Sequence, residues 1–340
     1  MTTAAQESPS VALMRLVNGY QVSQAIHVAA VLGIADHLIG GARRIEDLAQ
    51  ATATDSGSLY RLLRALAAVD IFREEEERVF ALTPMARCLG SDVNDPVGPW
   101  AAFIGRPYVR RAWDELLYSV QTGDSAFSHV HGTGVWAYRA QHPEEGALFD
   151  KAMTAISRQV CDAVVAAYDF AGAGRVVDVG GGEGALLAGI LNANPASSGV
   201  LFELEHVAAR AADRVAAMGL ASRVEIVSGS FFEQVPGGDI HVLKGILHDW
   251  DDRASADILH NCREAIAANG RLLVIERLIA PPNQGAEAKF SDLNMLVSPG
   301  GQERTREQFA GLFGAAGFRL ARLIATGTRM TIIEGEPMPP

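Results

Sequence analysis

The stretch VVDVGGGEGALL, residues 176–187, decides the fold of the C-terminal half of this chain. Four positions with a strand pattern run directly into three consecutive glycines, and a helical pattern follows. Each glycine raises the conformational entropy that folding must overcome, so three in a row need a purpose. Glycine lets the backbone turn tightly and approach a ligand, and the following helix directs its positive N-terminal end at that ligand. The stretch therefore predicts a ligand site at the carboxyl end of a strand.

Short β-rich runs alternate with helical runs through the rest of this half. That alternation predicts parallel strands joined by crossover helices. The segments FRLARLIAT (318–326) and RMTIIEG (329–335) predict a closing antiparallel pair at the sheet edge. We expect the parallel strands at 175–179, 199–203, 223–227, 239–244 and 271–276, with helices at 208–218 and 255–268 among them.

The N-terminal part of the chain predicts helices followed by a β-ribbon, which is the outline of a winged helix. Apolar spacing predicts helices at 25–38, 45–51 and 56–68, the last with an N-cap from Thr54 or Asp55. The leucines of that helix and Val69 fall on one face. Two short strands around a charged turn are predicted in IFREEEERVFALT, residues 71–83.

Electrostatics argue against a DNA-binding role for this region. The helix that would enter the groove carries only Arg61 and Arg64 as cations, and the wing carries four glutamates at 74–77. These carboxylates and the net charge of -11 would repel phosphates. We expect the region to pack against the second domain or a second copy of itself, and a DNA-binding regulator stays as the least favoured alternative.

Composition is that of a soluble globular protein. The chain has 340 residues, of which 49% are hydrophobic and 20% charged, enough for two domains with sizeable cores. Its apolar runs fall short of the ~20 residues of a membrane span, and MTTAAQESPS lacks the features of a signal peptide, so a cytoplasmic location is expected. The separated Cys88, Cys161 and Cys262 are expected to be buried thiols.

Two acidic residues narrow the choice of ligand, since NAD, FAD and other nucleoside cofactors share the glycine-rich turn. Glu203 ends the second strand about 20 residues beyond the glycines, where a carboxylate can accept hydrogen bonds from both ribose hydroxyls. Asp178, inside the first strand, is costly to bury without a partner. A sulfonium or amino-bearing ligand would suit it.

The segment LKGILHDWDD, residues 243–252, places His248 just past the end of the fourth strand. A histidine there has the right pKa to take a proton near neutral pH. His248 and Asp249 could ligate a metal, but no third ligand stands at a fitting spacing, so we predict no metal.

These segments together carry a family resemblance. The chain resembles the S-adenosylmethionine-dependent O-methyltransferases that include plant caffeic acid and bacterial polyketide and phenazine O-methyltransferases. The resemblance covers almost the whole chain, including SLYRLLRALAAVDIF at 58–72. The matching motifs, in order, are VVDVGGGEG (176–184), LFELEHV (201–207), GSFFEQVP (229–236), LKGILHDWDD (243–252), GRLLVIE (270–276) and DLNMLVSPGGQERTREQF (292–309).

The resemblance implies an α/β fold. Its core is a Rossmann-like, seven-stranded, mostly parallel methyltransferase sheet with an antiparallel edge strand. A mainly helical, winged-helix-like dimerisation domain is implied at 1–95. A helical linker region contributing to the acceptor pocket follows at 96–165, and the S-adenosylmethionine-binding catalytic domain occupies 166–340.

The resemblance also implies roles for individual residues. His248 corresponds to the general base, and Glu276 and Glu303 to the acidic pair that orients it. Ser230 stands in GSFF, where the family often has Asp, and can still accept a hydrogen bond from the adenine amino group. The residues expected to bind S-adenosylmethionine are Asp178, Gly180, Gly182, Glu203, Ser230, Phe231, Lys244 and Trp250.

The acceptor is predicted to be a small aromatic compound, and the enzyme a homodimer joined through its N-terminal domain. A family member acting on carbon or nitrogen, or using the cofactor for a reaction such as hydroxylation, remains an alternative. The resemblance implies that the acceptor pocket is lined by Phe149, Met153, Asn294 and Met295, with Trp113 and Phe127 as weaker candidates.

Overall fold

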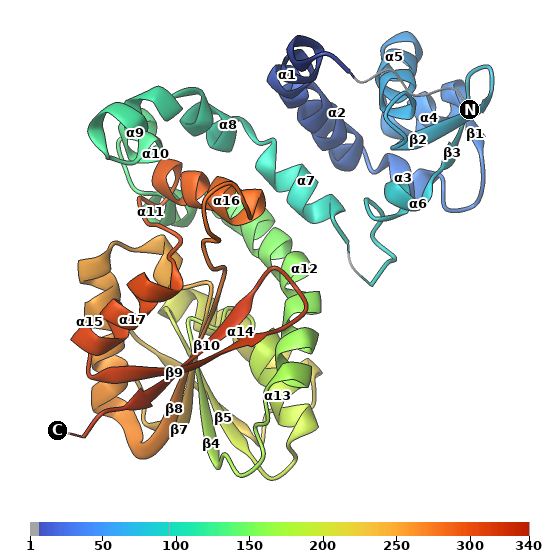
Figure 1. Ribbon diagram of the computed structural model, residues 1–340. Coiled ribbons are helices and arrows are strands. Elements are labelled where there is room, and N and C mark those ends of the chain that lie inside the picture. The colour runs from blue at the N-terminus through green and yellow to red at the C-terminus, as the bar shows by residue number, and fades with distance from the viewer. Residues whose placement is uncertain (1–6, 95, 340) are drawn as a thin grey trace, which may run out of the picture. The chain divides into compact units, whose positions relative to one another are not determined.

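A computed structural model of the protein describes residues 7–94 and 96–339 (Figure 1). Most of the MTTAAQESPS segment lies outside the described residues. The chain divides into two compact units, one of residues 1–110 and 144–156 and the other of 111–143 and 157–340. Residues 96–165 are shared between these units, and the division at 95 and 165 stays a prediction.

The first unit contains the winged-helix elements. Its described elements are α1 (Pro9–Val17), α2 (Gly19–Val31), α3 (Ile34–His37), β1 (Arg43–Arg44), α4 (Ile45–Thr52), α5 (Ser56–Ala67), β2 (Phe72–Glu76), β3 (Val79–Leu82), α6 (Pro84–Arg87), α7 (Gly98–Ile104) and the start of α8 (Pro107–Asp114). Of the long helix α12 (Pro143–Ala167), residues 144–156 belong to this unit and the others to the second.

Local sequence explains how these elements form. Asp55 caps α5 by accepting a hydrogen bond from the Ser58 N–H at 2.8 Å, as predicted. The leucines of α5 pack on Phe72 and Phe80 of the hairpin. The helix predicted at 25–38 is instead broken, because Gly33 adopts a left-handed φ of 62°. Val69 lies beyond the end of α5 and is exposed, contrary to its predicted place on the apolar face.

The second unit holds a seven-stranded sheet within the described residues. Strand order is β6-β5-β4-β7-β8-β10-β9, parallel except for β10, which runs antiparallel to both neighbours. Its strands are β4 (Arg175–Val179), β5 (Ser198–Glu203), β6 (Val224–Ser228), β7 (Gly238–Lys244), β8 (Ile266–Glu276), β9 (Phe318–Ala325) and β10 (Thr331–Pro337). Its further helices are α9 (Leu116–Thr122), α10 (Ala126–His131), α11 (Val135–Gln141), α13 (Ala185–Ala193), α14 (Glu205–Ala217), α15 (Asp252–Ala265), α16 (Ala286–Val297), α17 (Arg306–Ala315) and a 3-10 turn at Leu247–Asp249.

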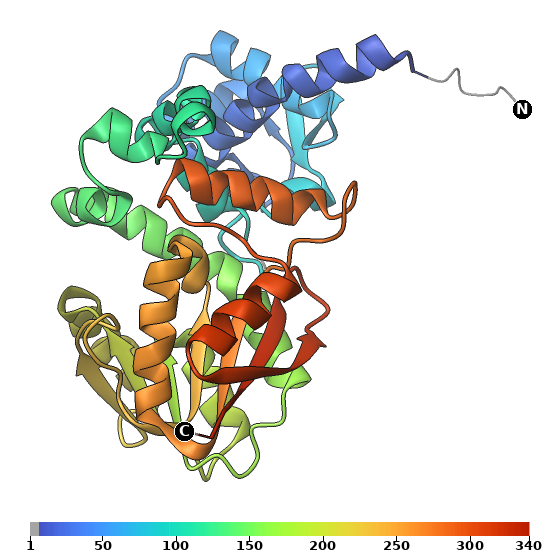
Figure 2. The ribbon, with the colours of Figure 1, turned by 60° about the vertical axis from the view of Figure 1, so that its left-hand side comes forward.

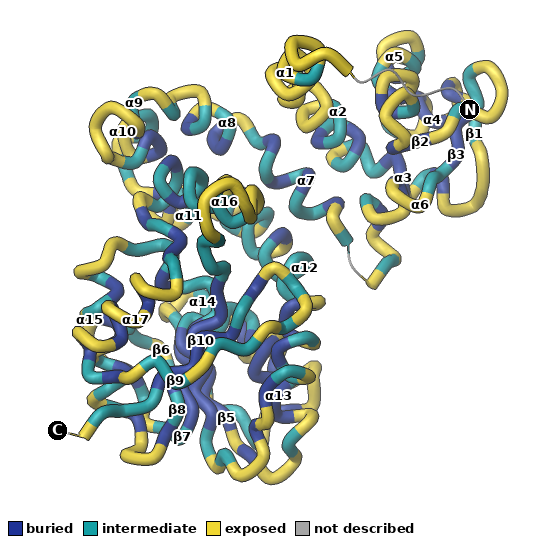
Figure 3. The backbone as a smooth tube through the Cα atoms, in the orientation of Figure 1, coloured by how far each residue is buried: buried dark blue, intermediate teal, exposed yellow. Residues whose placement is uncertain are grey.

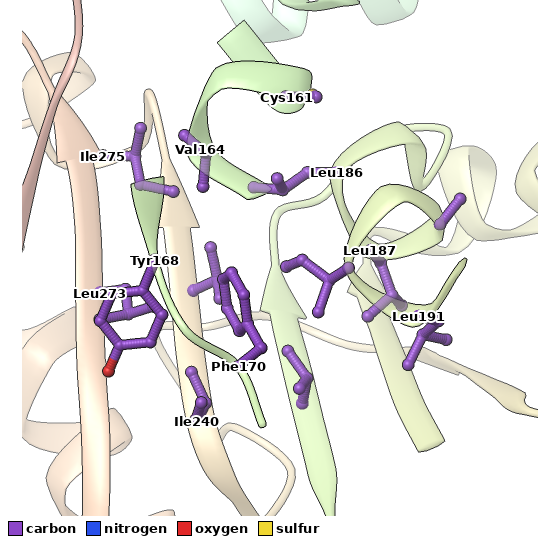
Figure 4. Packing of buried hydrophobic residues seen from close by; sticks show 14 of the residues in the cluster. Cys161, Val164, Tyr168, Phe170, Leu186, Leu187, Leu191, Ile240, Leu273 and Ile275 are labelled. Atoms are coloured by element: carbon purple, nitrogen blue, oxygen red, sulfur yellow. The ribbon is translucent and has the colours of Figure 1, made fainter. Parts of the chain in front are cut away.

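Helices cover both faces of this sheet (Figures 1 and 2). On one face, α13, α14 and the end of α12 pack through Val164, Leu187 and Val215, as part of the cluster in Figure 4. On the other face, α15 and α17 pack through Leu259 and Phe313. The inner strands β4, β5, β7, β8 and β10 are mostly buried, whereas the edge strands β6 and β9 are mostly not (Figure 3).

The strand order reverses between β4 and β7, because the chain adds β5 and β6 on one side of β4 and β7 and β8 on the other. Ligands of open α/β sheets bind beyond the carboxyl ends of the strands at such a switch point. Both the glycine-rich turn after β4 and the His248 segment after β7 therefore meet at the predicted position.

Two further expectations are corrected by the structure. The helix predicted at 255–268 ends at Ala265, and β8 already begins at Ile266. Of the three cysteines, Cys161 and Cys262 are buried as predicted, but Cys88 is exposed. Among the described residues, no helix combines the length and apolar character needed to cross a lipid bilayer.

A buried histidine makes the stability of this unit depend on pH. His241 on β7 has no exposed surface, and its Nε2 lies 2.8 Å from the Pro236 carbonyl. Burial lowers the pKa of His241 from 6.5 to about 4, against the raising effect of that carbonyl. The unfolded chain therefore binds a proton between these pH values that the folded protein does not.

We expect the free energy of unfolding to fall as pH drops from 6.5 toward 4, by about 3 kcal/mol from His241. Urea unfolding of wild type and His241→Gln at several pH values measures this, because glutamine does not titrate. An equal pH dependence in both proteins contradicts the assignment.

Candidate active site

The glycine-rich turn begins where β4 ends. Gly180 and Gly182 have left-handed φ values of 67° and 61°, a conformation that side chains with a Cβ rarely adopt. A Cβ at Gly180 would also lie 2.5 Å from the side chain of Ile246. The turn leads into α13, whose N-terminus points at this end of the sheet. The sequence prediction of a tight turn at a strand end is thus confirmed.

Asp178 lies beneath this turn and is 2% exposed. Its Oδ2 has no hydrogen-bond partner among the described residues. Burial raises the pKa of Asp178 to about 7, and the nearby charge of Lys244 opposes that rise. The Nζ of Lys244 donates to Ser157 Oγ at 3.0 Å. Asp178 therefore keeps an acceptor oxygen for a positively charged or amino-bearing ligand.

Glu203 ends β5 beside the same turn. Its Oε1 accepts a hydrogen bond from the Gly182 N–H at 2.8 Å, and its Oε2 accepts one from the Leu204 N–H at 2.9 Å. These bonds fix the carboxylate at the carboxyl edge of the sheet. The structure thus brings Glu203 and the glycines together, as the spacing in the sequence predicts.

An aromatic group borders the turn on its other side. The Phe231 ring lies 6.1 Å from that of Trp250, and the Phe232 ring lies 4.8 Å from it, both edge to face. A Cβ at Gly180 would be 3.8 Å from Phe231. Ser230 begins this loop and accepts the Phe232 N–H at 3.3 Å. Phe232 was missed in the sequence, although it directly follows the predicted Phe231.

His248 lies in the 3-10 turn after β7, and we call residues 247–250 the His248 turn. Its Nδ1 is 3.1 Å from Glu303 Oε1, which is hydrogen-bond distance. Its Nε2 is 3.7 Å from Asp249 Oδ1, too far for a hydrogen bond. An Nδ1–H that donates to Glu303 leaves the lone pair of neutral Nε2 available to accept a proton.

Glu303 is the carboxylate that orients the imidazole ring. Its Oε1 also accepts from Ser291 Oγ at 2.7 Å, and Arg277 lies 3.6 Å away. Burial would raise the pKa of Glu303, but the hydrogen bond and charge of His248, followed by Ser291 and Arg277, hold it below its usual value. Glu303 therefore stays ionised beside the imidazole. Ser291 and Arg277 were missed, because neither carries a sequence signal.

Glu276 contacts the backbone of the His248 turn, and its role as an orienting acid stays a prediction. This fully buried residue accepts the backbone N–H groups of Ile246 and His248 at 3.2 and 3.1 Å, and both of these bonds reach the turn backbone rather than the imidazole. Burial is the main cause that raises the pKa of Glu276 to about 7, with Glu303 adding to it and His248 opposing it. Glu276 thus holds the backbone of the His248 turn, and Glu303 holds the ring.

The imidazole itself has a strongly changed proton affinity. Burial lowers the pKa of His248, but the charges of Asp249, Glu276 and Glu303 outweigh burial and raise it to about 9. The ring is therefore mostly protonated at neutral pH when no other molecule contacts it.

Three side chains that could ligate a metal lie close together beside the His248 turn. Their spacing in the sequence did not indicate this cluster. Donor atoms of His248, Glu276 and Glu303 lie within 4.8 Å of one another. However, Glu276 Oε1 already accepts two backbone N–H groups, and Glu303 Oε1 accepts from Ser291 and lies at hydrogen-bond distance from His248. The arrangement suits a base with orienting acids, and the absence of a metal stays a prediction.

The predicted acceptor residues divide between the two units. Trp113 Nε1 donates to Asn294 Oδ1 at 3.1 Å, so the structure brings these two together. Met295, next to Asn294 on α16, is 8% exposed, and Phe127 is 1% exposed and packs within α10 and α11. The other two, Phe149 and Met153, belong to the first unit, where Phe149 packs on Phe103 at 5.4 Å.

Comparison with known families identifies the chain. A model of the O-methyltransferase domain matches residues 113–319. The chain belongs to the O-methyltransferase family. A model of the O-methyltransferase dimerisation domain matches residues 14–92, the region predicted to pack rather than to bind DNA.

Two curated relatives span nearly the whole chain. Phenazine O-methyltransferase PhzM of Lysobacter antibioticus is 41% identical over 327 residues, which cover 96% of each chain. An 8-amino-8-demethylriboflavin N,N-dimethyltransferase of Streptomyces davaonensis is 37% identical over 319 residues, covering 92% of this chain and 91% of that one. The family thus includes enzymes that methylate oxygen and enzymes that methylate nitrogen.

Solved structures confirm the fold. The crystal structure of LaPhzM matches with a TM-score of 0.93 and 41% identity, covering 98% of this chain and all of that one. The O-methyltransferase NcsB1 matches with a TM-score of 0.83 and 32% identity, over 98% of this chain and 100% of that one, and was solved with S-adenosylmethionine and 2-hydroxy-5-methyl naphthoic acid. The family methyltransferases use S-adenosylmethionine, and so does this one.

The residues at the switch point fit this cofactor. The unpartnered Oδ2 of Asp178 suits its charged amino acid end, and Glu203 at the glycine turn suits its ribose hydroxyls. The rings of Phe231 and Trp250 provide an apolar border for adenine. These individual contacts, including those of Lys244 and Ser230, remain predictions.

We expect the pKa of the His248 imidazole to lie near 9, and Glu303→Gln to lower it by removing a neighbouring carboxylate charge. NMR titration of the histidine ring protons, with His248→Gln to assign the signal among the nine histidines, measures both values. A His248 signal that titrates near 6.5 in the wild type would contradict the described geometry.

Proposed function

We propose that this enzyme transfers a methyl group to a hydroxyl of a small aromatic secondary metabolite, with His248 as the general base. The observation that carries the proposal is the imidazole held through Nδ1 by the ionised Glu303, with Nε2 left free of a close hydrogen bond. The relatives named phenazine O-methyltransferase and NcsB1 support an aromatic acceptor and an oxygen atom.

The residues of this chain supply the reactivity that a phenol lacks at neutral pH. S-adenosylmethionine provides a methyl group already activated by its sulfonium. A phenol has a pKa near 10 and is mostly protonated, so it is a poor nucleophile. The neutral form of His248, which is the minor form below its pKa of about 9, takes that proton through Nε2 as the oxygen attacks. General-base catalysis of this kind contributes roughly 10²–10⁴-fold. Glu303 fixes the tautomer and stabilises the imidazolium that forms.

Nitrogen is the second candidate for the acceptor atom. The riboflavin-related N,N-dimethyltransferase at 37% identity supports it. A neutral aromatic amine already presents a lone pair and loses its proton only after attack, so such an acceptor depends less on a base. The effect of removing His248 therefore separates the two candidates.

The first unit would join two copies of the chain. Helix α1 shows no buried residue within one chain, and Met14, Leu16 and Val17 are 59%, 71% and 61% exposed. An apolar surface of this kind indicates a protein interface. The match to the dimerisation domain over residues 14–92 supports a second copy as the partner.

The decisive assay follows methyl transfer from S-adenosylmethionine to a panel of aromatic hydroxy and amino compounds by mass. We expect one hydroxy compound to gain a methyl group, and His248→Ala to lower turnover about 100-fold or more. His260→Ala is the matched control, because His260 is an exposed histidine on α15. Turnover should rise with pH through the pKa of about 9, since only neutral His248 accepts a proton.

Other outcomes of this assay decide against parts of the proposal. Undiminished turnover in His248→Ala removes the base role, and methylation of amines alone favours nitrogen. Loss of turnover with EDTA that added metal restores would overturn the prediction of a metal-free site.

We expect size-exclusion chromatography with light scattering to give twice the chain mass. Leu16→Glu should shift the protein toward the monomer, because it places a charge in the apolar surface of α1. Met218→Glu, which changes an exposed methionine after α14, is the control and should leave the dimer intact. A wild-type monomer at micromolar concentration contradicts the dimer.

A further inference from the structure

Residues 301–304, which we call the GQER segment, follow the backbone of the His248 turn closely. A Cβ at Gly301 would lie 2.1 Å from the His248 carbonyl oxygen, so only glycine fits this approach. The N–H of Gln302 donates to that same carbonyl at 2.9 Å. Glu303 then holds the imidazole ring. Three consecutive residues therefore contact His248 itself.

Arg304, the fourth residue of the segment, reaches the two sides of the His248 turn. Its Nη1 donates to the Leu247 carbonyl at 2.9 Å, and its Nη2 donates to the Trp250 carbonyl at 2.9 Å. Nη2 also donates to Ser255 Oγ at 3.1 Å, and Nε donates to Asp252 Oδ1 at 2.9 Å. The guanidinium thus ties the residue before His248 to the end of the same turn.

Arg304 is buried, so its charged guanidinium needs hydrogen-bond partners inside the protein. Arg304 has no exposed surface and is the largest of the fully buried side chains. A buried charge costs several kcal/mol unless its partners compensate. Its acidic partner Asp252 has a side chain that is 66% exposed, so the ion pair alone compensates weakly. Most of the compensation therefore comes from the carbonyls of the His248 turn.

This arrangement couples the charge of Arg304 to the shape of the turn. The carbonyls of Leu247 and Trp250 must both face the guanidinium, which leaves little freedom to the peptide units between them. Those peptide units carry His248, whose N–H faces Glu276 and whose ring faces Glu303. A shift of the turn would lengthen the bond between Nδ1 and Glu303.

We propose that Arg304 is a positioning residue for the reaction: its guanidinium, bonded to both ends of the His248 turn, holds the imidazole against Glu303 with Nε2 directed to the acceptor. The proposal rests on the proposed function for the role of His248 as base. Arg304 acts through the backbone of the His248 turn and not through contact with a reacting atom.

A purely structural role is the alternative, and the chain offers a matched control for it. Arg223 is also an arginine whose guanidinium donates to backbone carbonyls, those of Leu191, Asn194 and Ser197. It directly precedes β6, at the opposite end of the strands from His248. Loss of Arg223 bonds should weaken the fold without altering the imidazole.

The experiment compares wild type with Arg304→Lys and Arg223→Lys, since lysine keeps the charge but not the forked geometry. We expect Arg304→Lys to lower kcat about 100-fold while KM and calorimetric binding of S-adenosylmethionine change less than about threefold. Because His248 loses part of its contact with Glu303, its NMR pKa should fall from about 9, and the acid limb of the kcat profile should move to lower pH. Arg223→Lys should change neither pKa nor profile.

The experiment tests the positioning role of Arg304 separately from the proposed base role of His248. If His248→Ala keeps full turnover, the base role fails, yet the NMR pKa still tests whether Arg304 positions the ring. An unchanged His248 pKa in Arg304→Lys, or an equal kcat loss in Arg223→Lys, overturns the positioning role.

A second variant covers the case in which Arg304→Lys does not fold. Ser255→Ala removes one Arg304 partner and the Ser255 Oγ bond to the Leu247 carbonyl at 3.2 Å, with little change of volume. We expect a smaller kcat loss, about tenfold, with the same direction of the His248 pKa change. A wild-type pKa and kcat in Ser255→Ala contradict the proposal.

Discussion

The hydrogen bond between His248 Nδ1 and Glu303 is the interaction on which the geometry of the candidate active site depends. It joins the turn after β7 to the segment after α16, two parts of the chain that are distant in sequence. Its length of 3.1 Å requires both backbones to be fixed, and Glu276 fixes the first through two N–H groups. Two carboxylates therefore hold His248: Glu303 contacts its ring, and Glu276 accepts its backbone N–H.

Those two carboxylates differ in their ionisation because they differ in their partners. His248, Ser291 and Arg277 keep the pKa of Glu303 low, whereas burial raises the pKa of Glu276 to about 7. One acid thus carries a stable charge beside the His248 imidazole, and the other accepts backbone donors. If His248 is the base that we propose, the imidazole can therefore stay oriented by two separate carboxylates while its own charge changes.

Much of the fold and part of the site could be predicted from the sequence. The spacing of apolar residues and the residues that end helices and strands are local properties of the chain. The strand 175–179 and the glycine turn were predicted with their observed bounds, and Glu203 was placed correctly by its distance from them. The break at Gly33 was missed because the apolar spacing was followed past a glycine, which is a local helix-end signal. The early start of β8 could not be predicted, since pairing with β7 decides it. The contact of Glu276 with backbone also could not, because it depends on the register of Lys244 with Ile275.

The position of β10 affects how the site is assembled. This antiparallel strand lies between β8 and β9, and its residues follow β9 in the chain. Until residues 331–337 have left the ribosome, one edge of β8 has no partner. Glu276 stands at the end of β8, so the backbone anchor of His248 rests on a strand that is completed late in synthesis. The glycine turn and strands β4 to β7 precede β10 in the chain, so their residues leave the ribosome before β8 gains its second neighbour.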